Sequence, residues 1–188
     1  MLDAFFSSLV LIFLSEMGDK TQLLALFLAA RFRQKYAIVL GILVATVANH
    51  IVSAWLGVWL NRLIENGILI WITGIAFIVV GLWLLIPDKD DEKQQNIRYG
   101  AFVTTLILFF LAEIGDKTQI ATVILAVNYN SVLIVALGST IGLLLANAPV
   151  IWLGEKLMQK IPIKAVHIAA CVLFCLTGIW ILLKTIIT

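Results

Sequence analysis

The stretch EMGDKTQ at residues 16–22 recurs almost unchanged as EIGDKTQ at residues 113–119. The two copies start 97 positions apart (113 − 16), and each lies inside a long apolar segment. Ionisable side chains are costly at membrane depth and persist there mainly where they bind or move something. Two matched acidic motifs in apolar surroundings therefore indicate a duplicated functional site.

The overall composition indicates an integral membrane protein. Of the 188 residues, 62% are hydrophobic and 13% are charged, and the mean hydropathy is +1.08. A soluble domain is about 45–50% apolar and about 25% charged. The net charge of +2 gives no reason to expect nucleic-acid binding, because the basic residues cluster at the ends of apolar segments. The start of the chain lacks the basic region of a cleavable signal peptide, so we expect the first helix to remain in the mature protein.

Six apolar segments approach the length of about 20 residues that a spanning helix needs. They cover residues 4–30, 36–60, 67–86, 100–127, 131–154 and 164–187. The clear linker is the charged stretch at 87–96 near the middle of the chain. We expect it to be a solvated loop, and a cytosolic metal sensor is the alternative.

The spacing of 97 extends well beyond the motif, which predicts a duplicated three-helix unit. The matched pairs are Gly41 with Gly138, Trp55 with Trp152, Gly57 with Gly154, Gly81 with Gly178, and Trp83 with Trp180. Because three spans is an odd number, the second unit must enter the membrane from the opposite side. The predicted fold is therefore an all-α integral membrane protein with six transmembrane helices in two inverted three-helix repeats. The first repeat covers 1–86, a charged cytoplasmic linker covers 87–99, and the second repeat covers 100–188.

Loop charges predict the orientation. Nine Lys and Arg residues lie in the loops that follow the first, third and fifth segments, whereas the opposite side has only Arg62 and Lys184. The positive-inside rule makes the basic side cytoplasmic and leaves both termini outside. Both motifs then lie about 18–20 Å deep, near the middle of the bilayer.

The motif residues predict a cluster of oxygen ligands. Glu16 and Asp19 are three positions apart, which places both on one face of a continuous helix. Glu113 and Asp116 repeat this arrangement in the fourth segment. We expect Gln22 and Gln119 to extend these faces, Lys20 and Lys117 to border them, and Thr21 and Thr118 to bond their own helix backbone. Gly18 and Gly115 permit either close helix contact or a local break that exposes carbonyl groups.

Charge balance favours a divalent cation as the ligand. Two acids and one lysine in each motif give two facing motifs a net charge of −2. Oxygen ligands suit hard cations such as Ca²⁺, Mg²⁺ and Mn²⁺. The predicted metal-binding residues are Glu16, Asp19, Gln22, Glu113, Asp116 and Gln119, with Asn49, Asn147, Lys20 and Lys117 as secondary candidates. Without metal, the crowded acids should hold protons, which provides a route to cation–proton exchange.

Some of these residues also have structural interpretations. An i,i+4 pair of Glu16 with Lys20 could be a structural ion pair, although this leaves Asp19 unexplained. Asn49 and Asn147 could serve interhelical hydrogen bonding instead of the site, and we expect His50 to be a packed polar residue. A small-residue packing stripe explains His167, Cys171 and Cys175 better than a soft-metal site does, because their partners 97 residues earlier carry no ligands.

The duplicated E-x-G-D-K-T-Q motif resembles the signature of the GDT family of cation transporters, and the resemblance covers essentially the whole chain. It implies transport of Mn²⁺ or Ca²⁺ against protons, with Glu16, Asp19, Glu113 and Asp116 as ligands. Small bacterial members look like manganese exporters, which implies a place in the bacterial inner membrane.

The expected function is therefore export of Mn²⁺ from the cytoplasm in exchange for protons, without covalent chemistry and without a permanent cofactor. The nearest alternative is Ca²⁺/H⁺ exchange. A passive cation channel and a membrane thiol–disulfide carrier are alternatives of other classes. The expected partners are a divalent metal ion, protons and the lipid bilayer, and the sequence leaves homo-oligomerisation open.

Overall fold

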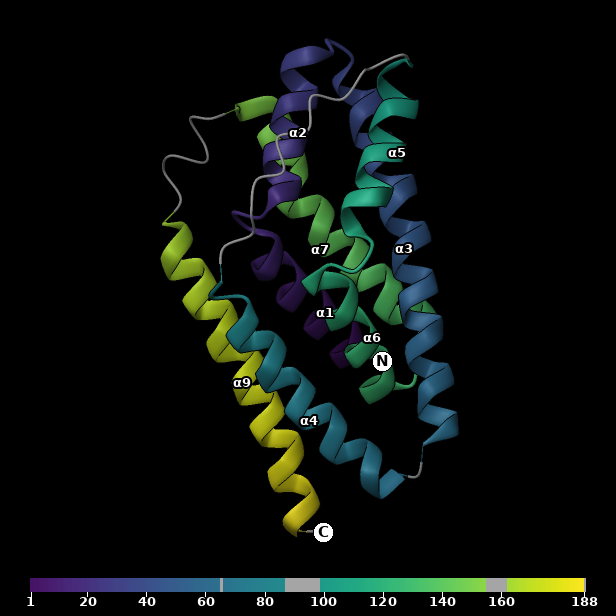
Figure 1. Cartoon of the computed structure of the whole chain (residues 1–188), viewed down its shortest axis with the longest axis vertical. Coiled ribbons are helices and arrows are strands. Elements are labelled where there is room, and N and C mark those ends of the chain that lie inside the picture. Colours follow the sequence, from purple (N-terminus) through teal and green to yellow (C-terminus); the bar gives the residue numbers. More distant parts are fainter. Residues whose placement is uncertain (65, 87–98, 155–161, 188) are drawn as a thin grey trace.

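Helices make up nearly all of the chain that the computed structural model describes, which is residues 1–64, 66–86, 99–154 and 162–187 (Figure 1). No strand occurs within these ranges. The helices are α1 (Leu2–Glu16), α2 (Lys20–Arg31), α3 (Lys35–Leu63), α4 (Asn66–Trp83), α5 (Ala101–Glu113), α6 (Lys117–Tyr129), α7 (Val132–Leu153) and α9 (Ile163–Ile187). The all-α prediction is confirmed, and residues 87–98 of the predicted linker lie outside the described residues.

The two motif-bearing segments are broken helices. The predicted segment 4–30 consists of α1 and α2, and the segment 100–127 consists of α5 and α6. In both, the interruption falls at the glycine of the motif, where φ is +82° at Gly18 and +74° at Gly115. Of the two possibilities left open for the motif glycines, the structure shows the local break, because a left-handed residue cannot continue a right-handed helix.

Within the described residues, three helices are long and apolar enough to cross a membrane, namely those at 35–63, 132–153 and 163–184. Shorter apolar helices occur at Gly67–Trp83 and Ala101–Glu113. The halves of the broken helices are individually too short to span a bilayer, because 20 residues are needed for about 30 Å.

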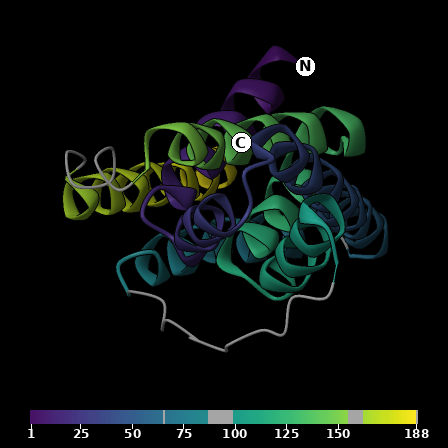
Figure 2. The same cartoon turned by 90° about the horizontal axis from the view of Figure 1, so that it is seen from above.

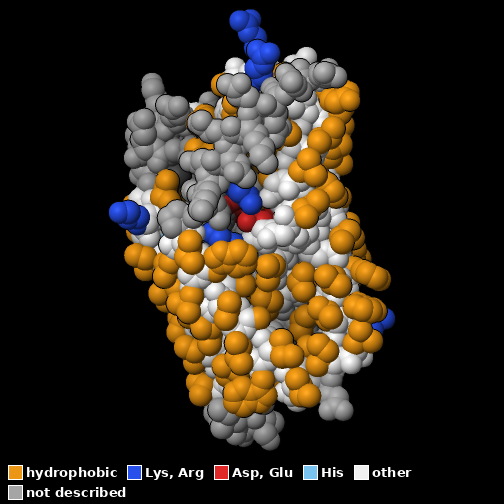
Figure 3. Space-filling view, viewed as in Figure 1, with side chains coloured by type: hydrophobic (Ala, Val, Ile, Leu, Met, Phe, Trp, Pro, Cys, Tyr) orange, Lys and Arg blue, Asp and Glu red, His pale blue; other side chains and the backbone are white. Residues whose placement is uncertain are grey.

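The distribution of polarity matches a protein surrounded by lipid. Large apolar side chains such as Trp180, Val52 and Ile75 are exposed. Figure 3 shows hydrophobic side chains spread widely over the lower part of the face in view. Polar and charged side chains, including Glu16 and Glu113, are buried. Water-soluble proteins show the reverse arrangement, so this chain is an integral membrane protein.

Helices α3 and α7 pack against each other and against the first half of a broken helix: α7 against α1, and α3 against α5. At each of these two contacts, a glycine allows the helices to approach closely. A Cβ atom on Gly138 would lie 3.0 Å from the Cβ of Ser8, and one on Gly41 would lie 2.8 Å from the Cβ of Thr105. Ser8 and Thr105 are 97 residues apart, as are Gly41 and Gly138, so the two halves of the sequence use equivalent positions for equivalent contacts.

Helices α4 and α9 form an antiparallel pair beside this assembly (Figures 1 and 2). Gly81 of α4 packs against Phe174 of α9, and its counterpart Gly178 packs against Phe77. The rings of Phe77 and Phe174 meet with their centroids 5.9 Å apart. Seen from above, α9 and α3 lie at opposite sides of the molecule (Figure 2).

Candidate cation site

Each motif forms an elbow between two helices, and we call the turns at 16–19 and 113–116 the first and second elbow. Asp19 is the N-cap of α2 and Asp116 is the N-cap of α6. In the first elbow, the carboxylate of Asp19 accepts a hydrogen bond from the backbone N–H of Thr21 at 3.5 Å. The two acids of a motif therefore belong to different helices, and the prediction that they share a helix face is corrected: the glycine between them redirects the chain.

A glutamine closes each elbow. The side-chain oxygen of Gln22 accepts a hydrogen bond from the backbone N–H of Gly18 at 2.9 Å, and Gln119 does the same for Gly115 at 2.6 Å. The amide nitrogen of Gln22 also donates to the carbonyl of Ala146 on α7 at 2.8 Å. Because an amide oxygen has two lone pairs, these bonds do not remove the glutamines from the predicted ligand set. They do show a second role, which is to hold the turn.

Carboxylates from both elbows meet in the interior. Oxygens of Glu16, Asp19 and Asp116 lie within 4.8 Å of one another, and all three residues are buried. Glu113 is also fully buried and lies within electrostatic reach of the other three acids. The structure thus brings together the four acids that the sequence singles out, although Glu113 is not part of the tight group of three.

Two threonines orient the glutamates, a role that the sequence analysis missed. The hydroxyl of Thr21 donates to Oε2 of Glu16 at 2.7 Å, and Thr118 donates to Oε2 of Glu113 at 3.3 Å. We expected both hydroxyls to bond their own helix backbone, which is wrong. The elbow brings a residue five positions later back onto the glutamate, and a continuous helix would not.

Several side-chain oxygens of the site lack a hydrogen-bond partner. Among the described residues, Oε1 of Glu16, Oε1 of Glu113 and Oδ1 of Asn147 are buried and accept no hydrogen bond. The amide nitrogen of Asn147 lies 3.4 Å from Oε2 of Glu16, which places its amide beside the acids. Buried oxygen atoms normally have partners, so such a group is suited to a cation that supplies the missing positive charge.

Asn49 and His50 of α3 link this helix to its neighbours. The amide nitrogen of Asn49 donates to the carbonyl of Phe110 on α5 at 3.2 Å. Nδ1 of His50 lies 3.1 Å from the hydroxyl of Thr140 on α7, as expected for a packed polar residue. In α9, Nε2 of His167 lies 2.9 Å from the carbonyl of Met17 and so joins α9 to the first elbow.

The cysteines of α9 lie on consecutive turns, with Sγ of Cys171 and Sγ of Cys175 separated by 4.0 Å. They face α4, where a Cβ atom on Gly81 would lie 3.2 Å from Sγ of Cys175. This close approach of α4 fits the expected packing stripe.

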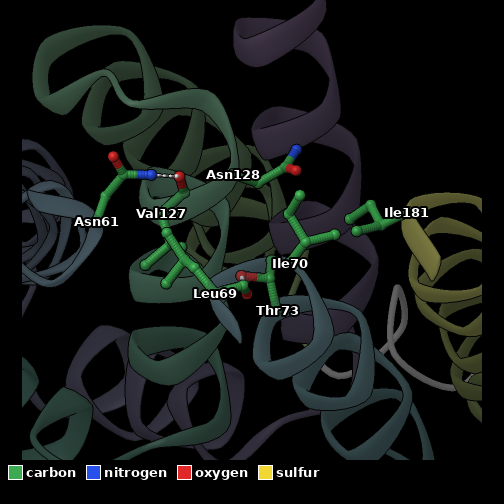
Figure 4. A pocket seen from close by; sticks show the side chains of 7 residues that line it. All are labelled: Asn61, Leu69, Ile70, Thr73, Val127, Asn128 and Ile181. Carbon is green, nitrogen blue, oxygen red and sulfur yellow. Dashed lines mark hydrogen bonds between the residues drawn. The ribbon is translucent and has the colours of Figure 1, made fainter. Parts of the chain in front are cut away.

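Two cavities lie away from the carboxylates. The smaller one, of about 140 Å³, is lined by residues of α3, α4, α6 and α9, and in it the amide of Asn61 donates to the carbonyl of Val127 at 2.8 Å (Figure 4). The larger one, of about 790 Å³, is lined in part by Asp3 of α1 and Lys184 of α9. These two residues lie near opposite ends of the chain, so the start of α1 and the end of α9 border the same cavity.

Buried acids at breaks in apolar helices are typical of membrane proteins that transport ions. The family model described as "Divalent cation/proton antiporter GDT1" matches residues 4–92 and again residues 101–187. The chain therefore belongs to the GDT1 family and is a divalent cation transporter, as the motif resemblance predicts.

Individual relatives agree with this assignment. A Vibrio cholerae protein named "Putative manganese exporter" is 43% identical over 173 residues, which is 92% of this chain and 86% of that protein. GDT1-like protein 4 of Oryza sativa subsp. indica is 32% identical over 186 residues, covering 85% of this chain and 66% of the relative. GDT1-like protein 5 of Arabidopsis thaliana is 28% identical over 225 residues, covering 99% and 98%. No solved structure matches the chain.

Proposed function

We propose that this protein exports Mn²⁺ from the cytoplasm in exchange for protons. The observation that carries the proposal is the meeting of buried carboxylates from two elbows 97 residues apart, with oxygens of Glu16, Asp19 and Asp116 within 4.8 Å of one another. The name of the Vibrio cholerae relative supports manganese as the cargo, and the family description supports the proton as the counter-ion.

The proposed ligands are the four motif acids. Glu16, Asp19 and Asp116 form the tight group, and Glu113 completes it with its unpartnered Oε1. Oδ1 of Asn147 is the proposed amide ligand. Gln22 and Gln119 hold the elbows and contribute their second lone pair, and Asn49 stabilises α3 against α5. Such an all-oxygen set suits a hard divalent cation.

Proton exchange follows from the same crowding of acids. Four buried carboxylates repel one another when no cation is bound, so protons compete with the metal for their oxygens. Metal binding from the cytoplasm would expel protons from the site, and protonation from the other side would release the metal. The cation and the proton therefore use one set of oxygens in turn, which couples their movements.

The proposed topology is two inverted three-helix repeats, 1–86 and 100–188, with the linker 87–99 in the cytoplasm of a bacterium and both termini outside its inner membrane. Contacts related by the spacing of 97 support the repeats, and the shared cavity at Asp3 and Lys184 supports an even number of spans. Rocking one repeat against the other would expose the elbows to each side in turn.

The test uses everted membrane vesicles, whose cytoplasmic face is outward. Addition of Mn²⁺ should cause Mn²⁺ uptake and simultaneous loss of protons from an acidified lumen. The Glu16→Gln variant should abolish both signals, because it removes a ligand charge from a fully buried position. The matched variant Asp3→Asn changes an exposed acid near the chain start and should retain transport.

The same vesicles separate the alternatives. Uptake of Ca²⁺ in preference to Mn²⁺ would support a Ca²⁺/H⁺ exchanger, and Mn²⁺ flux without proton movement would support a channel. Wild-type rates in Glu16→Gln would refute the site.

A further inference from the structure

The two motif lysines occupy equivalent positions in the sequence but have different partners in the structure. Nζ of Lys20 lies 3.1 Å from Oδ1 of Asp116, so this ion pair joins the two elbows. Nζ of Lys117 donates to the carbonyl of Ile86 after α4 at 2.7 Å and lies 6.0 Å from the ring centroid of Trp83. The two repeats therefore carry the same lysine, but in the folded protein it is Lys20 that pairs with a carboxylate of the site.

The partners in the ion pair differ in their access to solvent. The side chain of Asp116 is 4% exposed, whereas that of Lys20 is 34% exposed. A buried carboxylate needs a positive partner, because an unpaired buried charge is strongly destabilising. The ammonium group supplies that charge, and about a third of the lysine side chain is accessible to solvent. In Figure 3 a small group of acidic and basic side chains reaches the surface in the middle of a largely apolar face.

The ammonium and a bound metal would compete for the same carboxylate. Asp116 belongs to the group of three acids whose oxygens lie within 4.8 Å of one another. Hard cations bind oxygen at about 2–2.5 Å, so a metal in this group would lie within a few ångströms of the ammonium. Two cations that close repel strongly in a site with little water.

We propose that Lys20 is an internal competitor of the transported cation: its ammonium neutralises Asp116 in the metal-free site and is displaced when the metal binds. This inference rests on the proposed function and deepens it. The exchange moves a charge and transfers no proton from the lysine. The ammonium lowers the negative charge of the metal-free site by one, and it weakens metal binding, which favours release on the far side.

The test is the Mn²⁺ dissociation constant of the purified protein, measured by isothermal titration calorimetry at fixed pH. Lys20→Gln should tighten Mn²⁺ binding by roughly 3- to 30-fold, the range expected for removing a partly exposed charged competitor. Lys20→Arg keeps the positive charge and should bind Mn²⁺ with wild-type affinity. A merely structural ion pair predicts the opposite sign, because its loss would loosen the elbows and weaken binding.

Two further variants separate direct competition from general electrostatics. Arg31→Gln removes one positive charge from the far end of α2 and should leave the dissociation constant unchanged. Lys117→Gln removes the equivalent lysine and should tighten binding less than Lys20→Gln. Equal tightening by Lys20→Gln and Lys117→Gln would overturn the proposal, as would weaker binding in Lys20→Gln.

Chemical labelling gives a readout that does not depend on affinity. Acylation of Lys20 by an amine-reactive ester, followed by mass spectrometry, should increase several-fold when Mn²⁺ saturates the wild-type protein. Lys117 is buried and serves as the control for general opening of the structure. Unchanged labelling of Lys20 in protein that binds Mn²⁺ would overturn the inference about Lys20 but not the proposed function. Absence of both Mn²⁺ and Ca²⁺ binding to the wild-type protein would overturn the proposed function.

Discussion

The two elbow glycines provide a quantitative test of how the site is built. Both have left-handed backbone conformations, with φ of +82° at Gly18 and +74° at Gly115. Their surroundings differ. A Cβ atom on Gly18 would collide with Cγ2 of Ile163 and lie 3.4 Å from Nε2 of His167, whereas a Cβ atom on Gly115 would meet no described atom within 4 Å. Alanine substitutions therefore separate backbone strain from steric overlap.

Backbone strain and steric overlap set the expected losses of stability. An alanine in the left-handed region costs about 1–2 kcal/mol, which is the whole expected effect of Gly115→Ala. Gly18→Ala carries the same strain and adds overpacking against Ile163, which costs about 1–3 kcal/mol. Its total is therefore about 2–5 kcal/mol. For a chain of 188 residues, each kcal/mol lowers the melting temperature by about 2–4 °C.

The assay is thermal unfolding of purified protein in detergent, and a double-mutant cycle isolates the steric term. The β-branched side chain of Ile163 is attached close to the backbone and cannot swing aside easily. In an Ile163→Ala background the overlap disappears, so adding Gly18→Ala should cost only the strain of about 1–2 kcal/mol. Equal losses for the two single glycine variants, or no relief from Ile163→Ala, would refute the reasoning.

The remaining predictions concern the second layer of the site and the helix contacts. Thr21→Val should weaken Mn²⁺ binding about 10- to 100-fold in calorimetry, because Glu16 loses the hydroxyl that orients it, while Thr73→Val, whose hydroxyl bonds the carbonyl of Leu69 within α4, should leave binding unchanged. Gly138→Ala should lower thermal stability by about 1–3 kcal/mol, since its Cβ would lie 2.5 Å from the carbonyl oxygen of Phe5. The matched Gly67→Ala has open space and should be neutral or stabilising by up to about 1 kcal/mol. A tolerated Gly138→Ala would contradict the close packing of α7 on α1.

The class of protein could be predicted from the sequence because its causes are local. Hydrophobic segment length, the rarity of charge in apolar segments and the spacing of 97 are all visible in one dimension. The four acids could be named for the same reason: a carboxylate that remains in an apolar segment needs a compensating role. The family match confirmed the resemblance that rests on these motif residues.

The shape of the elbows was not predictable from the motif. A glycine at position 18 is compatible with both a close helix contact and a left-handed turn. The two conformations place different residues beside the acids. Helical spacing places Thr21 away from Glu16, but the break brings its hydroxyl within 2.7 Å of that carboxylate. Periodicity assumes a continuous helix, so it fails where one residue reverses the sign of φ.

Differences between the two copies of the motif come from the tertiary structure alone. Lys20 and Lys117 have identical sequence surroundings from the preceding glycine to the following glutamine, yet one pairs with Asp116 and the other with the carbonyl of Ile86. Likewise α9 packs against Gly18, while no described atom comes within 4 Å of a Cβ atom on Gly115. The sequence determined that two acidic elbows exist, because residue chemistry is a property of the chain. Only the packing of distant helices decided which lysine pairs with Asp116 of the site, because that depends on neighbours that no local pattern records.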